Sequence, residues 1–282
     1  MRIPHIADRL LRRLLELPPP HVHVSLLNRA LKVHLGSLTP GKVDYDDAWL
    51  LACALHARDV FDIGANVGTS SLMILLSPSV QNVLLVDPNP DALAIAAANL
   101  VHNGLVDNAR FVCAFVSDKA DEQIAFWTVG TGRAGSMYSS HADSARRQNS
   151  SMTVQTTTVD ALYERYGIIP DLVKIDVEGA ERLVLAGAAA CAAHHKTRFF
   201  IEVHSNPDLT MTQNAQHLLD WCAAHGYSAW FLKEKIRLTS PEPVAHRGRC
   251  HWLIQPASWE FPDWLLPLEE SAPLEKALAS AS

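Results

Sequence analysis

Apolar positions in the first part of the chain recur at the three- and four-residue spacing of helices. Residues 6–17 repeat leucines with arginines between them, and three consecutive prolines follow. Because proline interrupts a helix, this pattern predicts a short amphipathic helix that ends there. The same spacing predicts helices over residues 25–35 and 44–57. Residues 1–57 are therefore expected to form a helical extension that packs on its own domain or holds a homo-oligomer together.

After residue 57, short β-rich runs alternate with helical stretches. The runs include DVFDIG, NVLLVD, ARFVCAFV, DLVKID and RFFIEV, and this alternation predicts βαβ units with a parallel sheet. Two later runs, SAWFLK and CHWLIQ, flank a segment that looks like a hairpin arm or loop. We expect residues 58–265 to form one doubly wound α/β domain. Residues 266–282 are expected to be a C-terminal tail, which is small and polar enough to be loose from residue 271 onward.

Charge and composition narrow the possible partners. The 282 residues include 24 basic and 30 acidic side chains, which give a formal net charge of -6. Such a chain has no general basic field, so nucleic acid is not an expected partner. No apolar run approaches the roughly 18 residues of a membrane span, so stable membrane insertion is not expected. Five distant cysteines without a CxxC pair predict reduced thiols and a cytoplasmic location.

A glycine-containing loop, DIGANVG, ends one predicted strand and begins a helix. The free backbone N–H groups of a helix start, together with tight glycine turns, suit a nucleotide-like ligand. A dinucleotide fingerprint has glycine at its second position, where the backbone approaches a pyrophosphate, but this chain has Asn66 there. The loop therefore favours a cofactor with an adenosine and no phosphate, such as S-adenosylmethionine, over NAD. A strand-to-helix turn without any ligand is the alternative.

Asp87 ends the next predicted strand. Its separation from the glycine loop is typical of an acidic residue that accepts hydrogen bonds from both ribose hydroxyls. Asn89 and Pro90 follow as a predicted N-cap and first helical residue, so Asp87 could instead belong to the helix entry. The loop and Asp87 together favour the ligand.

Polar side chains also end two later strands. DLVKID ends in Asp176, and RFFIEVH places Glu202 and His204 on one face of its strand. Because the carboxyl ends of neighbouring parallel strands meet at one edge, we expect these three side chains to converge. The alternative is a structural ion pair of Lys174 with one carboxylate, and a His204 that is simply hydrogen-bonded.

Four motifs carry a resemblance to a known family. DIGANVG, VDPNPDAL, DLVKIDVEGAE and IEVH, in this order and spacing, resemble the FkbM family of S-adenosylmethionine-dependent methyltransferases over about residues 59–252. The resemblance implies a Rossmann-like, mostly parallel seven-stranded sheet and O-methylation of a hydroxyl on a sugar or polyketide-like small molecule or glycan in natural product biosynthesis. It also implies a set of cofactor-binding residues: Asp62, Gly64, Ala65, Asn66 and Gly68 for the methionine part, Asp87 for the ribose, and Phe115, Val116 and Ser117 for the adenine.

The acceptor hydroxyl must lose a proton during methyl transfer. His204, with an ordinary pKa of about 6.5, would suit general-base work, with Asp176 or Glu202 to orient it or to accept the proton directly. Alternatively, Asp176 and Glu202 could hold Mg²⁺ and acidify a coordinated hydroxyl, whereas a histidine ligand would suggest a transition metal. Two carboxylates without a third leave a cation site undercharged, so the metal-free base is favoured.

Two further possibilities stay open at this point. An NAD-dependent oxidoreductase is the rival enzyme, and a non-catalytic regulatory protein that binds S-adenosylmethionine is the rival outside catalysis. Residues 131–150 are rich in glycine, serine and arginine, so they could form a lid whose Arg133, Arg146 and Arg147 meet an anionic group, or a solvated loop.

Overall fold

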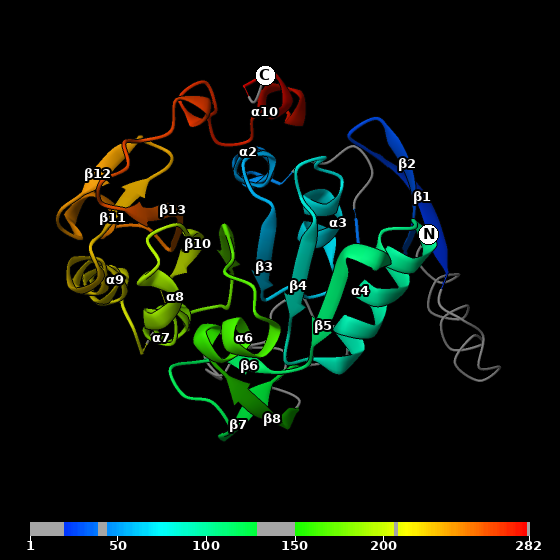
Figure 1. Ribbon diagram of the computed structural model, residues 1–282, viewed down its shortest axis with the longest axis horizontal. Coiled ribbons are helices and arrows are strands. Elements are labelled where there is room, and N and C mark those ends of the chain that lie inside the picture. The colour runs from blue at the N-terminus through cyan, green and yellow to red at the C-terminus, as the bar shows by residue number, and fades with distance from the viewer. Residues whose placement is uncertain (1–19, 39–43, 129–149, 206–207, 281–282) are drawn as a thin grey trace, which may run out of the picture.

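The computed structural model describes residues 20–38, 44–128, 150–205 and 208–280, with an eight-stranded sheet between two layers of helices (Figure 1). The strands, in spatial order, are β12 (Ile236–Leu238), β11 (Tyr227–Phe231), β13 (Arg249–Pro256), β10 (Arg198–His204), β9 (Leu172–Ile175), β3 (Asp59–Ile63), β4 (Asn82–Val86) and β5 (Ala109–Val112). Strands β5, β4, β3, β9 and β10 run parallel, and β13 pairs antiparallel with both β10 and β11.

The predicted Rossmann-like α/β fold is confirmed, but the sheet is mixed and has eight strands rather than seven. The additional strand is β12, which pairs antiparallel with β11. It lies in the segment that looked like a hairpin arm or loop. Only three residues long, it lacks a run long enough to show an alternating pattern.

Helices cover both faces of the sheet. On one side lie α2 (Asp47–Leu55), α3 (Thr69–Leu75), α4 (Pro90–His102) and α10 (Leu274–Ser280), and on the other α6 (Val159–Tyr166), α7 (Glu181–Ala186), α8 (Ala189–Ala192) and α9 (Met211–His225). Successive strand residues point to opposite faces, so Val60 packs into one hydrophobic core and Phe61 into the other. Both faces of the central parallel strands β3, β4 and β9 are therefore buried, as such strands require.

A second, three-stranded sheet lies below the main one in Figure 1. Its order is β6 (Phe115–Val116), β8 (Ser151–Thr157) and β7 (Gln123–Trp127). The run ARFVCAFV is consequently split, because β5 belongs to the main sheet and β6 to the small one. The predicted lid, residues 131–150 with Arg133, Arg146 and Arg147, lies almost entirely outside the described residues.

The predicted helix over residues 25–35 is wrong. The chain forms an antiparallel hairpin of β1 (His21–Leu26) and β2 (Arg29–His34), in which Leu26 pairs with Arg29. The two residues between the strands have positive φ, 50° at Leu27 and 59° at Asn28, as a two-residue type I′ turn requires.

The pattern in this segment has the two-residue period of a strand, as Leu31 and Val33 show. Both side chains are fully buried, and the residues on either side of them are more exposed. The hairpin packs on α4 through Asn103, whose Oδ1 accepts from Lys32 N at 2.9 Å and whose Nδ2 donates to Lys32 O at 2.9 Å. The predicted helix over residues 44–57 is present as α2, and that over residues 6–17 lies outside the described residues.

The expectation of a loose C-terminal tail is wrong for the last described segment. Residues 274–280 form α10, which packs on α2. Leu274 and Ala277, three residues apart, are buried, and Ser271 N donates to Tyr45 O at 2.8 Å. No helix in the described part of the chain combines the length and hydrophobicity of a membrane span.

Candidate active site

Two loops meet at the centre of the main sheet, where the strand order reverses. After β3 the chain continues to β4 on one side, and after β9 it continues to β10 on the other. Gly64 N donates to Val86 O at 2.9 Å, and Asp176 N donates to Ile63 O at 3.1 Å. Gly64 has a φ of +76°, and a Cβ on it would lie 1.9 Å from Asp176 O. Glycine is therefore required where the loops touch, at the position where open α/β sheets bind ligands.

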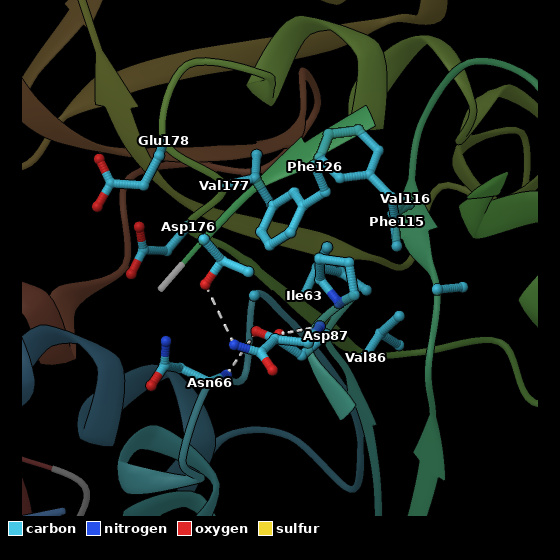
Figure 2. A pocket seen from close by; sticks show the side chains of 15 residues that line it. Ile63, Asn66, Val86, Asp87, Phe115, Val116, Phe126, Asp176, Val177 and Glu178 are labelled. Carbon is cyan, nitrogen blue, oxygen red and sulfur yellow. Dashed lines mark hydrogen bonds between the residues drawn. The ribbon is translucent and has the colours of Figure 1, made fainter. Parts of the chain in front are cut away.

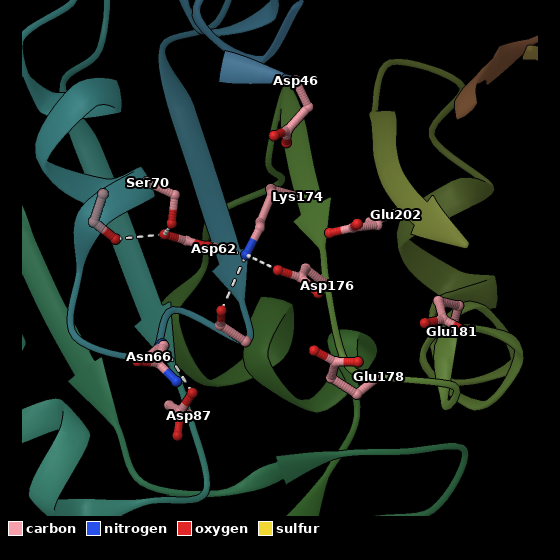
Figure 3. Close-up of polar contacts among 12 residues, drawn as sticks. Asp46, Asp62, Asn66, Ser70, Asp87, Lys174, Asp176, Glu178, Glu181 and Glu202 are labelled. Carbon is pink, nitrogen blue, oxygen red and sulfur yellow. Dashed lines mark hydrogen bonds and ion pairs between the residues drawn. The ribbon is translucent and has the colours of Figure 1, made fainter. Parts of the chain in front are cut away.

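The Asp62 side chain supports the glycine loop through contacts with the residues that follow it and with Lys174. The side chain is fully buried, and its Oδ2 accepts from Ser70 Oγ at 2.7 Å and Ser71 Oγ at 2.5 Å (Figure 3). Its Oδ1 lies 3.3 Å from Lys174 Nζ. Asp62 thus supports the loop and does not line either of the cavities described below.

Lys174 ties the two loops together. Its Nζ donates to Gly64 O at 3.0 Å and lies 3.6 Å from Asp176 Oδ2. Burial alone would lower the pKa of Lys174, but the charges of Asp62 and Asp176 outweigh it and raise that pKa, so the side chain stays charged. The ion pair that the sequence suggested as an alternative is therefore present, and Asp62 shares it.

Asp87 joins the glycine loop to the end of β4. Its Oδ2 accepts from Asn66 N and its Oδ1 from Asn89 N, both at 2.8 Å. Burial is the largest effect on this carboxyl and raises its pKa to about 6. Asn89, rather than Asp87, caps α4, because its side chain accepts from Asp91 N and Ala92 N. Asp87 therefore holds the N-cap residue of α4 through its backbone and also bonds the glycine loop, so it joins the helix entry to that loop.

A narrow cavity of about 60 Å³ opens between these loops (Figure 2). Asn66 and Asp87 form a polar part of its wall, and Phe115, Val116 and Phe126 form an apolar part. Ser117, predicted with them, does not line the cavity, and its Oγ instead donates to Asp118 Oδ1 at 3.0 Å. Gly68 does not line it either: a Cβ there would lie 2.9 Å from the Cβ of Ala96, so this glycine lets α3 approach α4 closely.

A wider cleft of about 320 Å³ adjoins the narrow cavity. Gly64, Asn66, Asp176 and Glu178 line both, so the two spaces meet at the ends of β3 and β9. Ala65 lines only the wider cleft and not the narrow cavity. Its other walls carry charged and polar side chains, among them Asp44, Tyr45, Asp46, Asp47, Glu202 and Arg249.

The three predicted catalytic residues come together at this junction. One ligand-type atom from each of Asp176, Glu202 and His204 lies within 4.8 Å of the other two. His204 Nδ1 is 2.9 Å from Glu181 Oε1, and its Nε2 is 3.6 Å from Glu178 Oε2 and 3.7 Å from Glu202 Oε1. Burial lowers the pKa of His204, but the hydrogen bond and charge of Glu181, followed by the charges of Asp176 and Glu178, raise it to about 10.

Side chains that the sequence did not single out hold Glu202. Tyr45 OH donates to Glu202 Oε1, and Arg249 Nη1 lies 3.2 Å from the same oxygen. The Arg249 guanidinium also lies over the Tyr45 ring, 4.5 Å from its centre. Burial, followed by the charge of Asp176, raises the pKa of Glu202. Tyr45 and Arg249 carry no motif of their own, and only the pairing of β13 with β10 brings Arg249 opposite His204.

The model of the methyltransferase FkbM domain matches residues 62–229, more than half of the chain. The chain belongs to the FkbM methyltransferase family. The part that matches the FkbM domain contains Asp87, Asp176, Glu202 and His204, whereas Tyr45 and Arg249 lie outside it. The predicted family is therefore confirmed.

Solved structures with a similar fold include methyltransferase FkbM from Methylobacillus flagellatus KT, which has 13% identity and a TM-score of 0.44 over 71% of this chain and 43% of that chain. The match therefore spans less than half of that protein. A putative O-methyltransferase from Klebsiella pneumoniae has 12% identity and a TM-score of 0.43 over 77% of this chain and 82% of that chain. None of the curated proteins matches this FkbM-family chain.

Proposed function

We propose that this chain transfers a methyl group from S-adenosylmethionine to a hydroxyl of a small molecule or glycan, of a sugar or polyketide-like kind. The observation that carries the proposal is the junction of two unlike cavities at the ends of β3 and β9. One is narrow and has both polar and apolar walls, and the other is a wider, polar cleft. The reacting methyl group would lie where the two meet.

The lining of the narrow cavity offers the polar and apolar groups that an adenosine would contact. The Asp87 carboxylate would accept the ribose hydroxyls, and Phe115 and Val116 supply apolar walls for the adenine ring. Gly64, Ala65 and Asn66 would hold the methionine part, because this loop lines the cavities where they meet beside Asp176. Asp62 and Gly68 support this loop without lining the cavity.

The cleft supplies the residues that would handle the acceptor. S-adenosylmethionine, when bound, presents a methyl group on a sulfonium that a nucleophilic oxygen displaces in line. Asp176 and Glu202 line the cleft, so either carboxylate can reach the proton of an acceptor hydroxyl. The His204 side chain is only 8% exposed and lies behind Glu202, with Nδ1 engaged by Glu181. The geometry therefore supports a carboxylate as the proton acceptor more than the predicted histidine base.

Binding and turnover test the two parts of this proposal separately. Calorimetric titration should show that the full chain binds S-adenosylmethionine and its demethylated product. Binding of NAD without binding of either would contradict the proposed function in favour of an oxidoreductase.

A screen of hydroxylated sugars and polyketides, read by mass spectrometry, should show the gain of one methyl group on a hydroxyl. A chain that binds the cofactor but methylates none of them would favour a regulatory protein. A cytoplasmic location, a homo-oligomer held by the N-terminal segment, and the domain limits at residues 57 and 265 stay predictions.

A further inference from the structure

We propose that Asp176, Glu202 and His204 bind one divalent cation of the Mn²⁺ type at the junction of the two cavities. Its role in catalysis rests on the proposed function, whereas its binding does not. The cation would coordinate the acceptor hydroxyl at the point where the oxygen meets the methyl group.

The spacing of the donor atoms suits one cation. All three atoms lie within 4.8 Å of one another. Around a six-coordinate ion with bonds of about 2.1 to 2.3 Å, adjacent donors lie about 3 Å apart and opposite donors somewhat over 4 Å. A small contraction of the cluster therefore brings the side chains to bonding distance. The remaining positions face a cleft that both Asp176 and Glu202 line, so a substrate oxygen and water can reach them.

The histidine is held as metal-binding histidines usually are. Such a histidine commonly donates its other ring N–H to a carboxylate, which fixes the ring and makes the free nitrogen more basic. Here Nδ1 of His204 lies 2.9 Å from Oε1 of Glu181, a fully buried residue. Glu181 is itself fixed by Asn214 Nδ2 and by Gly179 N, both at 2.9 Å. This arrangement orients Nε2 of His204 toward Glu202 and Glu178, and a cation bound there would replace the proton that the ring carries in the metal-free protein.

Negative charge accumulates at the same point. The carboxylates of Asp176, Glu178 and Glu202 surround a common space at the ends of β9 and β10 (Figure 3). Lys174 is shared between Asp176 and Asp62, and the Arg249 side chain is 58% exposed. From the sequence, the objection to a metal was the lack of a third carboxylate, which left the cation site undercharged. The fold brings Glu178 to the same cleft as Asp176 and Glu202, with its Oε2 at 3.6 Å from Nε2 of His204.

The mixed donor set selects the class of ion. Mg²⁺ and Ca²⁺ prefer oxygen donors alone, whereas two carboxylates, one imidazole and open positions for oxygen suit Mn²⁺ and its first-row neighbours. The bound ion would acidify the acceptor hydroxyl. With Asp176 and Glu202 engaged as ligands, the proton of the hydroxyl would pass to the remaining carboxylate, Glu178, which lines both cavities. The oxygen then forms a bond to the methyl carbon as the carbon–sulfur bond breaks, and that electron pair stays on sulfur.

Binding of Mn²⁺ alone tests the site. The full chain, stripped of metal by a chelator that is then removed, is titrated with MnCl₂ while the electron paramagnetic resonance signal of free Mn²⁺ is recorded. We expect one bound ion per chain, and an affinity lowered by at least about tenfold in Glu202→Gln and in His204→Gln. Because His204 is buried, circular dichroism must show that the His204 variant is folded. Glu202 lines the cleft, so the Glu202 variant tests the metal site without replacing the buried histidine.

Asp47→Asn is the matched control, because Asp47 lines the same cleft but is not one of the three ligands. It removes one negative charge and should change the affinity less than about threefold. An absence of stoichiometric binding by the folded protein, or an equal loss in Asp47→Asn and Glu202→Gln, would overturn the proposal. If Mn²⁺ binds and no methyl transfer is found, only the proposed function fails. If chelated protein methylates at full rate without binding Mn²⁺, only the metal site fails.

Discussion

Single residues that follow β3 and β4 line the narrow cavity and hold its loops together. Gly64 permits contact between the loops after β3 and β9, and Asp87 links the first loop to β4. Their identities follow from different physical demands. Gly64 is required because a side chain there would collide with the backbone of Asp176. Asp87 supplies a buried hydrogen-bond acceptor, and its burial raises the pKa of the carboxyl group to about 6.

Replacement of Asp87 by alanine should weaken S-adenosylmethionine binding by roughly 1.5 to 3 kcal/mol, the range for lost charge-assisted hydrogen bonds. Calorimetric titration measures this change. The variant should stay folded, since Asn89 still caps α4. An unchanged affinity in folded protein would mean that Asp87 only joins the loop to the strand.

The same carboxyl predicts a pH dependence of binding. It must be ionised to accept two ribose hydroxyls, and its raised pKa of about 6 means that the ligand-free protein holds the proton below that pH. Affinity should therefore fall as pH decreases through about 6, by up to about tenfold per pH unit. Titrations between pH 5 and 8 test this, and Asp87→Asn should bind weakly with a flatter profile. If the affinity of the wild-type protein does not change between pH 5 and 8, the prediction is wrong.

Gly64→Ala should destabilise the protein, because a Cβ would lie 1.9 Å from Asp176 O and φ is +76°. We expect a loss of at least about 2 kcal/mol in the free energy of unfolding, from left-handed strain and overlap together. Gly104→Ala is the control: φ is +65° there, with nothing within 4 Å of the added Cβ, so it should lose only the strain of about 1 kcal/mol. Urea unfolding compares them, and equal losses would contradict the role assigned to the loop contact.

At the scale of elements, the hairpin of β1 and β2 shows how a short segment can mislead. Residues 25–35 carry leucines and a valine that fit helical spacing, yet Leu31 and Val33 alternate into the core as strand residues. The two-residue turn favours the hairpin, and so does Asn103, the residue that follows α4, whose side chain bonds both backbone groups of Lys32. The contribution of these two features cannot be predicted from residues 25–35 alone, because it depends on the helix against which the hairpin packs.

Asn28→Ala should lower the free energy of unfolding by about 1 kcal/mol, because Asn28 is exposed and has a φ of 59° that alanine rarely adopts. Asn28→Gly keeps the turn accessible and should be neutral or slightly stabilising. Denaturant melts of the two variants separate turn strain from the loss of a side chain. A glycine variant as unstable as the alanine variant would argue against the type I′ turn.

At the scale of the whole molecule, the proposed cofactor site draws on β3, β4, β9 and the small sheet, so a bound ligand would link segments that are distant in sequence. S-adenosylmethionine at 100 times its dissociation constant should stabilise the fold by about 2.7 kcal/mol, and NAD should not. Thermal unfolding with each ligand measures this. Equal melting temperatures with and without S-adenosylmethionine would contradict specific binding to the folded chain.

The sequence by itself determined the α/β alternation, the family, the glycine loop and the strand-end positions of Asp87, Asp176, Glu202 and His204, because strand ends and glycine turns leave local patterns. Only the tertiary structure decided that Asp62 lies beneath the loop, that Ser117 points elsewhere, and that β12 completes a mixed sheet. It also brought Tyr45 and Arg249 onto Glu202 and placed Glu181 behind His204. These contacts join residues between 23 and 157 positions apart, and such distances leave no trace in local spacing, since packing of separate elements sets them.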